Sequence, residues 1–263
     1  MSAATQITNL REARHGFSPE EWEARLDLAA AYRLAARFGW HDMLGNHFSL
    51  RVPGTPDHYL LNPLGLFFEE ITASSLVKLD LKGNILSEAR HGINKAGEVI
   101  HGGILAARPD INSVMHLHNA AGTGLSAQRD GLLPISQNAL ILMNRVRYHD
   151  YHGPASSSEE ERRVLARDLG DGSILILRNH GTLTAGRTIG EAFVLLGRIE
   201  RAAEIQIAAQ AGGAVHYPSQ DAIDRTIAIG SRMYAPDGRS PGAALEWAAF
   251  RRKLDREDPG YAA

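Results

Sequence analysis

The chain has 263 residues, of which 44% are apolar and 22% are charged, and its formal net charge at pH 7 is −2. This length is enough to bury a sizeable core, and the near-neutral charge gives no general attraction for nucleic acid or an anionic membrane. The absence of cysteine excludes disulfides, thiol nucleophiles and cysteine-built metal sites. No apolar run approaches the ~18 residues of a membrane-spanning helix, so we expect a cytoplasmic protein with a small-molecule substrate.

Residues 1–17 lack the continuous apolar segment of a signal peptide, and we expect them to form a flexible N-terminal arm. Ser18 and Glu21 then form a capping-box pattern that predicts the start of a helix. Helical spacing of apolar residues extends this helix to Phe38. From there helices and strands alternate without a linker or repeat, so residues 18–263 are predicted to form a single domain.

The remaining elements are predicted from apolar periodicity and from turn and capping residues. Their alternation along the chain is typical of an α/β fold. The expected strands cover residues 48–52, 59–61, 76–80, 85–87, 111–118, 139–143 and 174–177. The expected helices cover residues 96–107, 119–127, 158–168, 188–211 and 240–256.

The strand predicted over residues 111–118 ends in two histidines, His116 and His118. Alternate residues of a strand lie on one face, roughly 6.5–7 Å apart, so the two imidazoles can converge on one cation. His180, in the turn after the strand of residues 174–177, is the best candidate for a third ligand. Zinc is the divalent metal that best suits such nitrogen ligands, with manganese or iron as alternatives. By spacing alone, the histidine pair is equally compatible with the polar edge of an ordinary strand.

Five short motifs resemble the class II aldolase/adducin family and stand in that family's order within residues 28–212. The resemblance implies a three-layer α/β/α fold around a mixed central sheet, commonly assembled as a homotetramer with active sites near subunit interfaces. It also implies that the three histidines hold a catalytic divalent metal. The motifs are Gly45-Asn46-His47-Phe48-Ser49, Asn62-Pro63-Leu64-Gly65, Arg108-Pro109-Asp110, His116-Leu117-His118 and Asn179-His180-Gly181.

Three neutral imidazoles leave the charge of a bound ion and part of its coordination sphere available, as in catalytic metal sites. The resemblance implies that the ion stabilises negative charge as a carbon–carbon bond of the substrate breaks, through a metal-stabilised enolate. We therefore expect a metal-dependent lyase, either an aldolase or a decarboxylase. The alternatives are a non-enzymatic, adducin-like assembly module and a metal-dependent oxygenase on the same scaffold.

The aldolases of the family carry a catalytic glutamate at a position that corresponds here to Gly97. The neighbouring Glu98 is expected to take this role, with His101 as its partner on the same helical face. The alternative for Glu98 is an ordinary acid at a helix start. Tyr151 and Tyr148 are candidate proton donors, with packing as the alternative for each. Other histidines expected to line the site are His47, His149 and His152.

The phosphate-binding residues of the family's sugar-phosphate aldolases are matched only in part. Asn46 and Gly65 keep their places, but Leu64 replaces a threonine, and Lys95-Ala96 replace two serines. A buried phosphate would lack the hydroxyl donors it needs. Asn46, Gly65 and Lys95 are therefore expected to bind a smaller, non-phosphorylated hydroxy, keto or aromatic acid, with a solvated surface position as the alternative for Lys95.

Overall fold

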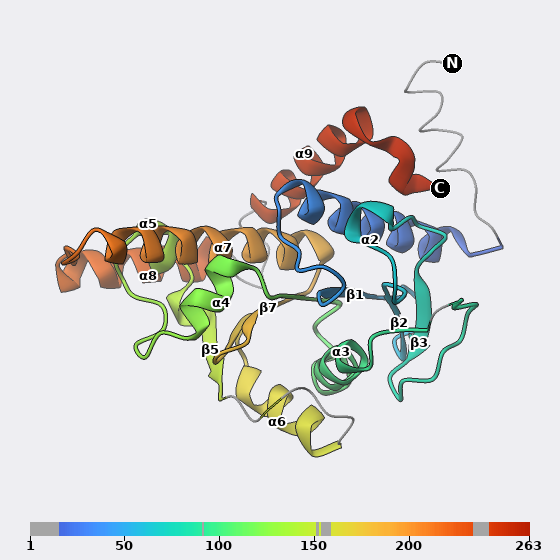
Figure 1. Cartoon of the computed structure of the whole chain (residues 1–263), viewed down its shortest axis with the longest axis horizontal. Helices are drawn as coiled ribbons and strands as arrows, with labels where there is room; N and C mark the ends of the chain where they lie inside the picture. The colour runs from blue at the N-terminus through green and yellow to red at the C-terminus, as the bar shows by residue number, and fades with distance from the viewer. Residues whose placement is uncertain (1–15, 91, 151–152, 154–158, 234–241) are drawn as a thin grey trace.

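The computed structural model describes residues 16–90, 92–150, 153, 159–233 and 242–263. These residues form a seven-stranded mixed sheet with helices on both faces (Figure 1), which confirms the predicted α/β class. The strand order is β3-β2-β1-β4-β7-β6-β5; β5 and β6 pair in parallel and the other neighbours pair antiparallel. The strands are β1 (His47–Arg51), β2 (His58–Leu61), β3 (Val77–Asp80), β4 (Ser113–Leu117), β5 (Val146–His149), β6 (Ile174–Leu177) and β7 (Gly181–Gly186).

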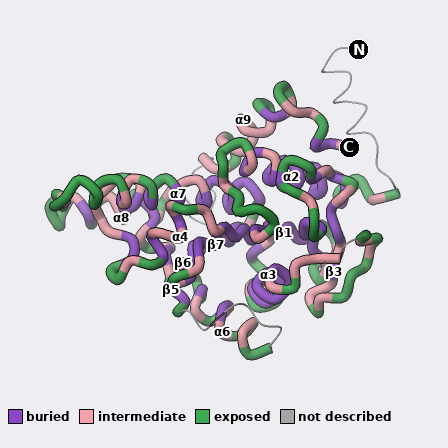
Figure 2. Tube along the Cα trace, viewed as in Figure 1, coloured by how far each residue is buried: buried purple, intermediate pink, exposed green. Residues whose placement is uncertain are grey.

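Two layers of helices enclose the sheet (Figure 1). One face is covered by α2 (Pro19–Arg37), α7 (Ile189–Ala211) and α9 (Gly242–Glu257), and the other by α3 (Lys95–Ala107) and α6 (Glu159–Leu169). Figure 2 shows that α3 is largely buried beneath the sheet. The shorter elements are η1 (Phe68–Glu70), α4 (Ala120–Ser126), α5 (Gln137–Leu140), η2 (Met143–Arg145), α8 (Gln220–Met233) and η3 (Pro259–Ala262).

The central strand β4 has two buried faces. Met115 and Leu117 pack into the core cluster that contains residues of α2 and α7, whereas Val114 packs into the cluster that contains residues of α3 and α6. Because side chains alternate along a strand, His116 lies on the same face as Val114. The first histidine of the predicted pair is thus directed toward the α3 side of the sheet.

The capping patterns locate the two long helices correctly. The Ser18 side chain accepts the N–H of Glu21 at 3.1 Å at the start of α2, and Thr188 accepts the N–H of Glu191 at 3.1 Å at the start of α7. Both bonds satisfy donors that the first helical turn leaves without partners. Gly39 follows α2 with a φ of +70°, a left-handed conformation that glycine adopts without steric cost.

The strand predicted over residues 139–143 is wrong. The Ser136 hydroxyl accepts the N–H of Ala139 at 3.2 Å and begins α5, and η2 follows it before β5 begins at Val146. Ile141 and Leu142 are apolar because they pack in a core cluster with α7, not because they pair in a sheet. A short apolar run indicates burial, but it does not distinguish a strand from a buried helical turn.

Three further differences concern regular structure. Residues 85–87 make a single bridge, between Leu79 and Ile85, in place of a second hairpin strand. The sequence did not predict α8 or β7; β7 carries two glycines and two threonines, which hide its buried strand character.

Of the predicted N-terminal arm, Gly16 and Phe17 are described, and Phe17 stacks on Trp22 at 6.0 Å between ring centroids. Within the described ranges, no helix has both the length and the apolar character required to cross a bilayer.

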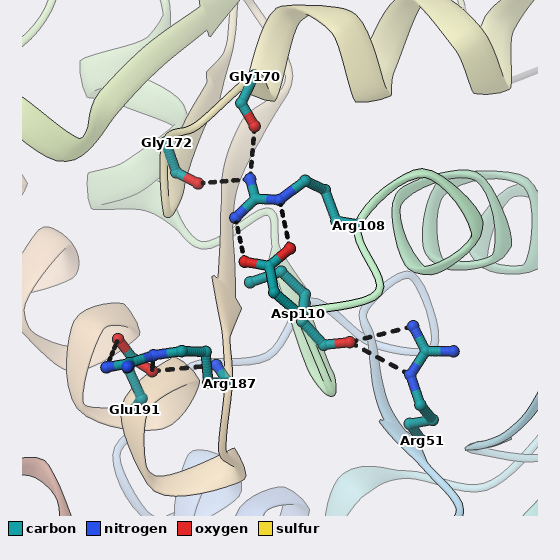
Figure 3. Close-up of polar contacts among 8 residues, drawn as sticks. Arg51, Arg108, Asp110, Gly170, Gly172, Arg187 and Glu191 are labelled. Carbon is teal, nitrogen blue, oxygen red and sulfur yellow. Dashed lines mark hydrogen bonds and ion pairs between the residues drawn. The ribbon is translucent and has the colours of Figure 1, made fainter. Parts of the chain in front are cut away.

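The Arg108-Pro109-Asp110 motif is a structural clamp at the start of β4 (Figure 3). The Arg108 guanidinium pairs with Asp110 at 2.7 and 2.8 Å and donates to the carbonyl oxygens of Gly170 at 2.5 Å and Gly172 at 3.3 Å. The Arg51 side chain donates to the carbonyl of Ile111. These bonds tie β4 to the turn before β6 and to the end of β1. The motif therefore stabilises the end of β4 opposite to the histidines.

Candidate metal centre

The three predicted histidines converge where β4 and β7 meet. Nε2 of His116 lies 2.7 Å from Nε2 of His118 and 3.4 Å from Nε2 of His180, and the last two atoms are 2.9 Å apart. In the described part of the chain, these three histidines form the group of potential ligand side chains that can share one ion. Zinc–nitrogen bonds of ~2.0–2.1 Å in a tetrahedral site place the nitrogens about 3.3 Å apart. The cluster thus fits a divalent ion after a small opening of the rings.

The hydrogen bonding and burial of the rings favour the ligand form of imidazole. Nδ1 of His116 donates to the carbonyl oxygen of Thr182 at 2.9 Å, which leaves the Nε2 lone pair directed at the cluster. Burial lowers the pKa of His116 well below its ordinary value and lowers the pKa of His180 to about 4. Neutral rings present lone pairs to a cation, so the donor set is suited to a divalent metal.

Each residue of the Asn179-His180-Gly181 turn contributes to the conformation or the anchoring of the turn. Asn179 adopts a φ of +56°, a left-handed conformation that asparagine tolerates better than most side chains. A Cβ added to Gly181 would lie 2.1 Å from the carbonyl oxygen of Leu117, so only glycine fits where β7 approaches β4. The N–H of His180 donates to the Ser126 hydroxyl at 3.2 Å, which anchors the turn to α4.

A fourth histidine lies against the cluster. His47 is the β1 partner of His116, and the centroids of the two rings are 5.1 Å apart. Nδ1 of His47 lies 2.8 Å from Nε2 of His101, and Nδ1 of His101 lies 2.5 Å from the Ser49 hydroxyl. Burial lowers the pKa of His47 well below its ordinary value and that of His101 to about 3. A buried, neutral row of hydrogen-bonded side chains therefore connects α3 with the cluster.

Glu98 does not face the histidines, which corrects the expectation that it shares their side of α3. Its carboxylate is 0% exposed and pairs with Arg162 of α6, and Oε2 lies 2.7 Å from Nζ of Lys95. His101, three residues later, contacts β1 instead. Successive helical residues are rotated by about 100°, so a shift of one residue turns the side chain from the sheet toward α6.

The residue that faces His47 from the first turn of α3 is Gly97. A Cβ at Gly97 would lie 3.0 Å from Cγ and Cδ2 of His47, tighter than ordinary van der Waals contact. Gly97 and His101 are one helical turn apart and share this face. The His47 ring thus occupies the space that a side chain at position 97 would need.

The three predicted substrate-binding residues have different surroundings. Asn46 is buried beside His47; its Oδ1 accepts the N–H of Asp42 at 2.5 Å, and its Nδ2 has no hydrogen-bond partner in the described part of the chain. Gly65 lies in the loop after β2 with a φ of +90°. Lys95 lines a hollow of about 540 Å³ between α3 and α6 that includes none of the three clustered histidines.

Of the candidate tyrosines and the remaining histidines, the described residues Tyr148 and His149 lie at the end of β5. The Tyr148 hydroxyl accepts the N–H of Leu132 at 3.0 Å, and the Arg178 guanidinium lies 4.4 Å from the centroid of the Tyr148 ring. Nδ1 of His149 lies 2.8 Å from Oδ2 of Asp168. Tyr151 and His152 fall outside the described residues, so the prediction for Tyr151 stays a prediction.

Sequence reasoning gave no role to Glu200, which is fully buried in α7 behind the cluster. Its Oε1 accepts the Thr182 hydroxyl at 2.5 Å. Burial raises its pKa to about 7, although hydrogen bonds from Thr182 and Asn119 act in the opposite direction. A single glutamate on a long amphipathic helix carries no sequence signal for such a position, because only the packing of α7 on β7 and α4 creates it.

The raised pKa of Glu200 predicts that the stability of the fold depends on pH. Its folded pKa of about 7 exceeds the ordinary value of 4.5, so the protonated folded state is favoured, and this contribution declines as pH rises from 4.5 through 7. Relative to Glu200→Gln, the wild-type protein is expected to lose about 3 kcal/mol of unfolding free energy across that window. Urea unfolding of both proteins at about pH 4.5, 6 and 8 measures this difference. A difference that does not change with pH would contradict the prediction.

Comparison with known proteins agrees with this architecture. Residues 26–207 match the sequence model of the class II aldolase and adducin N-terminal domain. A protein from Caulobacter vibrioides, whose name assigns it to aldolase class 2, is 46% identical to this chain over 250 residues. These residues are 93% of this chain and 94% of that protein. Alpha-adducin of Rattus norvegicus is 43% identical over 248 residues, which are 92% of this chain and 32% of the adducin.

A solved structure extends the similarity to three dimensions. The crystal structure of an aldolase II superfamily protein from Pseudomonas syringae is 46% identical in sequence and has a TM-score of 0.90. The match covers 96% of this chain and 100% of that one. The chain therefore belongs to the class II aldolase/adducin family.

Proposed function

We propose that the protein is a divalent-metal-dependent carbon–carbon lyase, with zinc as the preferred ion and manganese or iron as alternatives. The observation that carries the proposal is the convergence of the Nε2 atoms of His116, His118 and His180 within 3.4 Å of one another. No carboxylate belongs to this group in the described part of the chain, so three neutral ligands would leave positions for substrate oxygens. A bound ion supplies positive charge that stabilises negative charge developing on the substrate.

The residues beside the ligands are suited to hold the substrate and to move a proton. The Nε2 atom of His47 makes no hydrogen bond to the described residues, while Nδ1 is held by His101. Both ring nitrogens of His101 are engaged, with His47 and with Ser49, so His101 acts through His47. The buried Nδ2 of Asn46, also without a partner among the described residues, can donate to a substrate oxygen.

The contacts of Glu98 favour decarboxylation over retro-aldol cleavage. Its carboxylate is held by Arg162 and Lys95, so the residue predicted as the aldolase base is engaged elsewhere. In a decarboxylation the bond to CO₂ breaks and its electron pair stays on the substrate, so no base has to remove a proton first. A proton then forms a new carbon–hydrogen bond at the carbon that lost CO₂, and Nε2–H of His47 is its proposed donor.

An assembly module is the second candidate, and the adducin relatives support it. Alpha-adducin aligns with 92% of this chain, although this chain spans only 32% of the adducin. An assembly module would not require an ion at the histidine cluster. Homotetramer formation and cytoplasmic localisation stay predictions from the resemblance and the composition.

Metal analysis and a product assay separate the two candidates. The protein, purified without added metal, is expected to contain close to one zinc, manganese or iron ion per chain, or to take one up when it is supplied. It should release CO₂ from small hydroxy, keto or aromatic acids. A metal content below about 0.1 per chain that added ions do not restore would contradict the lyase and favour the assembly module, because three converging imidazoles bind such ions well.

A further inference from the structure

Glu200 joins the two elements that flank the histidine cluster. It lies on α7, and its carboxyl group is 0% exposed. Oε1 accepts the hydroxyl of Thr182 on β7 at 2.5 Å. The carboxyl group also lies against the first turn of α4, because a Cβ added to Gly122 would be 2.6 Å from Oε1 and 3.0 Å from Oε2. One buried side chain thus contacts both β7 and α4.

The contact with β7 leads directly to one candidate ligand. The carbonyl oxygen of Thr182 accepts the Nδ1–H of His116 at 2.9 Å, while the hydroxyl of the same residue donates to Glu200. The hydroxyl bond limits movement of Thr182, and the carbonyl bond sets the orientation and tautomer of the His116 ring. Glu200 therefore acts on His116 through one intervening residue.

The contact with α4 leads to the other two candidate ligands. Asn119 immediately follows His118, and its side chain accepts the N–H of Gly122 at 3.2 Å to cap α4. One turn into the helix, the Thr123 hydroxyl donates to the carbonyl oxygen of His180 at 3.3 Å. A displacement of this first turn would move the backbone of both histidines.

Burying the second carboxylate oxygen of Glu200 costs folding free energy. Oε2 of Glu200 is buried without a hydrogen bond of normal geometry among the described residues, and Asn119 and the backbone of Gly122 are further polar groups beside the carboxyl group that favour its charged form. A leucine of similar size would avoid the cost of burying this oxygen, but it would leave the Thr182 hydroxyl without its acceptor. The feature that distinguishes glutamate here is the acceptor it offers to Thr182.

We propose that Glu200 is a positioning residue of the metal centre, which sets the geometry of the three histidines through Thr182 and the first turn of α4. The inference rests on the proposed metal-dependent function, but it concerns the arrangement of the ligands around the ion and not the reaction. Cobalt(II), which replaces zinc and has absorption bands sensitive to ligand geometry, is the probe.

In the whole 263-residue chain, Glu200→Leu is expected to weaken Co²⁺ and Zn²⁺ binding about 10- to 100-fold, as the loss of an orienting partner of a metal ligand typically does, and to change the cobalt absorption bands. Glu200→Gln keeps an acceptor for Thr182, so its affinity should stay within about threefold of wild type and its spectrum should be retained. Thr182→Val should resemble Glu200→Leu, and Thr182→Ser should resemble the wild type. The Thr182 pair keeps the test decisive if Glu200→Leu does not fold.

Glu191→Leu is the matched control, since Glu191 is also a buried acid of α7 but pairs with Arg187 away from the cluster. It is expected to lower stability and to leave the cobalt spectrum unchanged. Folded Glu200→Leu and Thr182→Val variants with wild-type affinity and spectrum would overturn the proposal.

If the wild-type protein binds no cobalt, the proposed metal-dependent function fails, and the positioning role is tested on the metal-free protein. The readout is the imidazole N–H proton of His116 in the NMR spectrum. It should exchange slowly in the wild type and in Glu200→Gln, and rapidly in Glu200→Leu and Thr182→Val. Equal exchange in all four proteins would refute the positioning role.

Discussion

Replacing His118 by alanine is expected to weaken zinc binding by about 100- to 1,000-fold and to abolish lyase activity. A zinc site with four ligands provides ~10–16 kcal/mol, so each ligand contributes about 2.5–4 kcal/mol. His116→Ala and His180→Ala should have effects of the same size, because the Nε2 atoms of all three rings lie within 3.4 Å of one another. Competition with a chromophoric chelator measures the affinities.

A suitable control for the ligand variants is His216→Ala, since His216 lies in the loop before α8 and has no place in the cluster. Its zinc affinity should equal that of the wild type. Circular dichroism should show that each ligand variant keeps its secondary structure. Full zinc occupancy in His180→Ala would exclude His180 as the third ligand, and His47, whose ring is 5.1 Å from that of His116, would be the next to test.

The second large effect concerns the charge of the substrate. Sugar phosphates are expected to be cleaved at kcat/KM values at least about 1,000-fold below that of the best small carboxylic acid. Leu64 and Ala96 provide none of the hydroxyl donors that a phosphate needs, and Lys95 is already paired with Glu98. Burying a dianion with too few partners costs several kcal/mol, which corresponds to a thousandfold or more in affinity.

A substrate panel tests this expectation. Sugar phosphates and small hydroxy, keto and aromatic acids are assayed with zinc, manganese and iron, and both CO₂ and aldehyde products are recorded. Leu64→Thr is an informative variant, because it introduces one hydroxyl at a loop position where the side chain is 40% exposed. If the wild-type protein has any activity toward phosphorylated substrates, Leu64→Thr should raise it. Cleavage of a sugar phosphate at kcat/KM near the ordinary ~10⁴ M⁻¹s⁻¹ would show that the site accepts a dianion after all.

Local patterns in the sequence determined the elements that carry the site. Capping boxes at Ser18 and Thr188 located the two long helices, because a cap depends on residues within one helical turn. The spacing of His116 and His118 predicted that both imidazoles point to one side of the sheet; His116 lies in β4 and His118 directly follows it. The turn that contains His180 was likewise visible, since Asn179 and Gly181 meet backbone requirements that few other residues satisfy.

Only the tertiary structure decided what surrounds these histidines. Periodicity shows that α3 has buried faces but does not say which neighbour each face meets, so it could not direct Glu98 to α6 and Gly97 to His47. Glu200 likewise reaches Thr182 because α7 packs across β7, a contact between residues 18 positions apart in the chain. The sequence determined the ligand-bearing elements through short-range backbone geometry. Packing between distant segments determined which acids and histidines reach the cluster, because those contacts depend on the whole arrangement of the helices on the sheet.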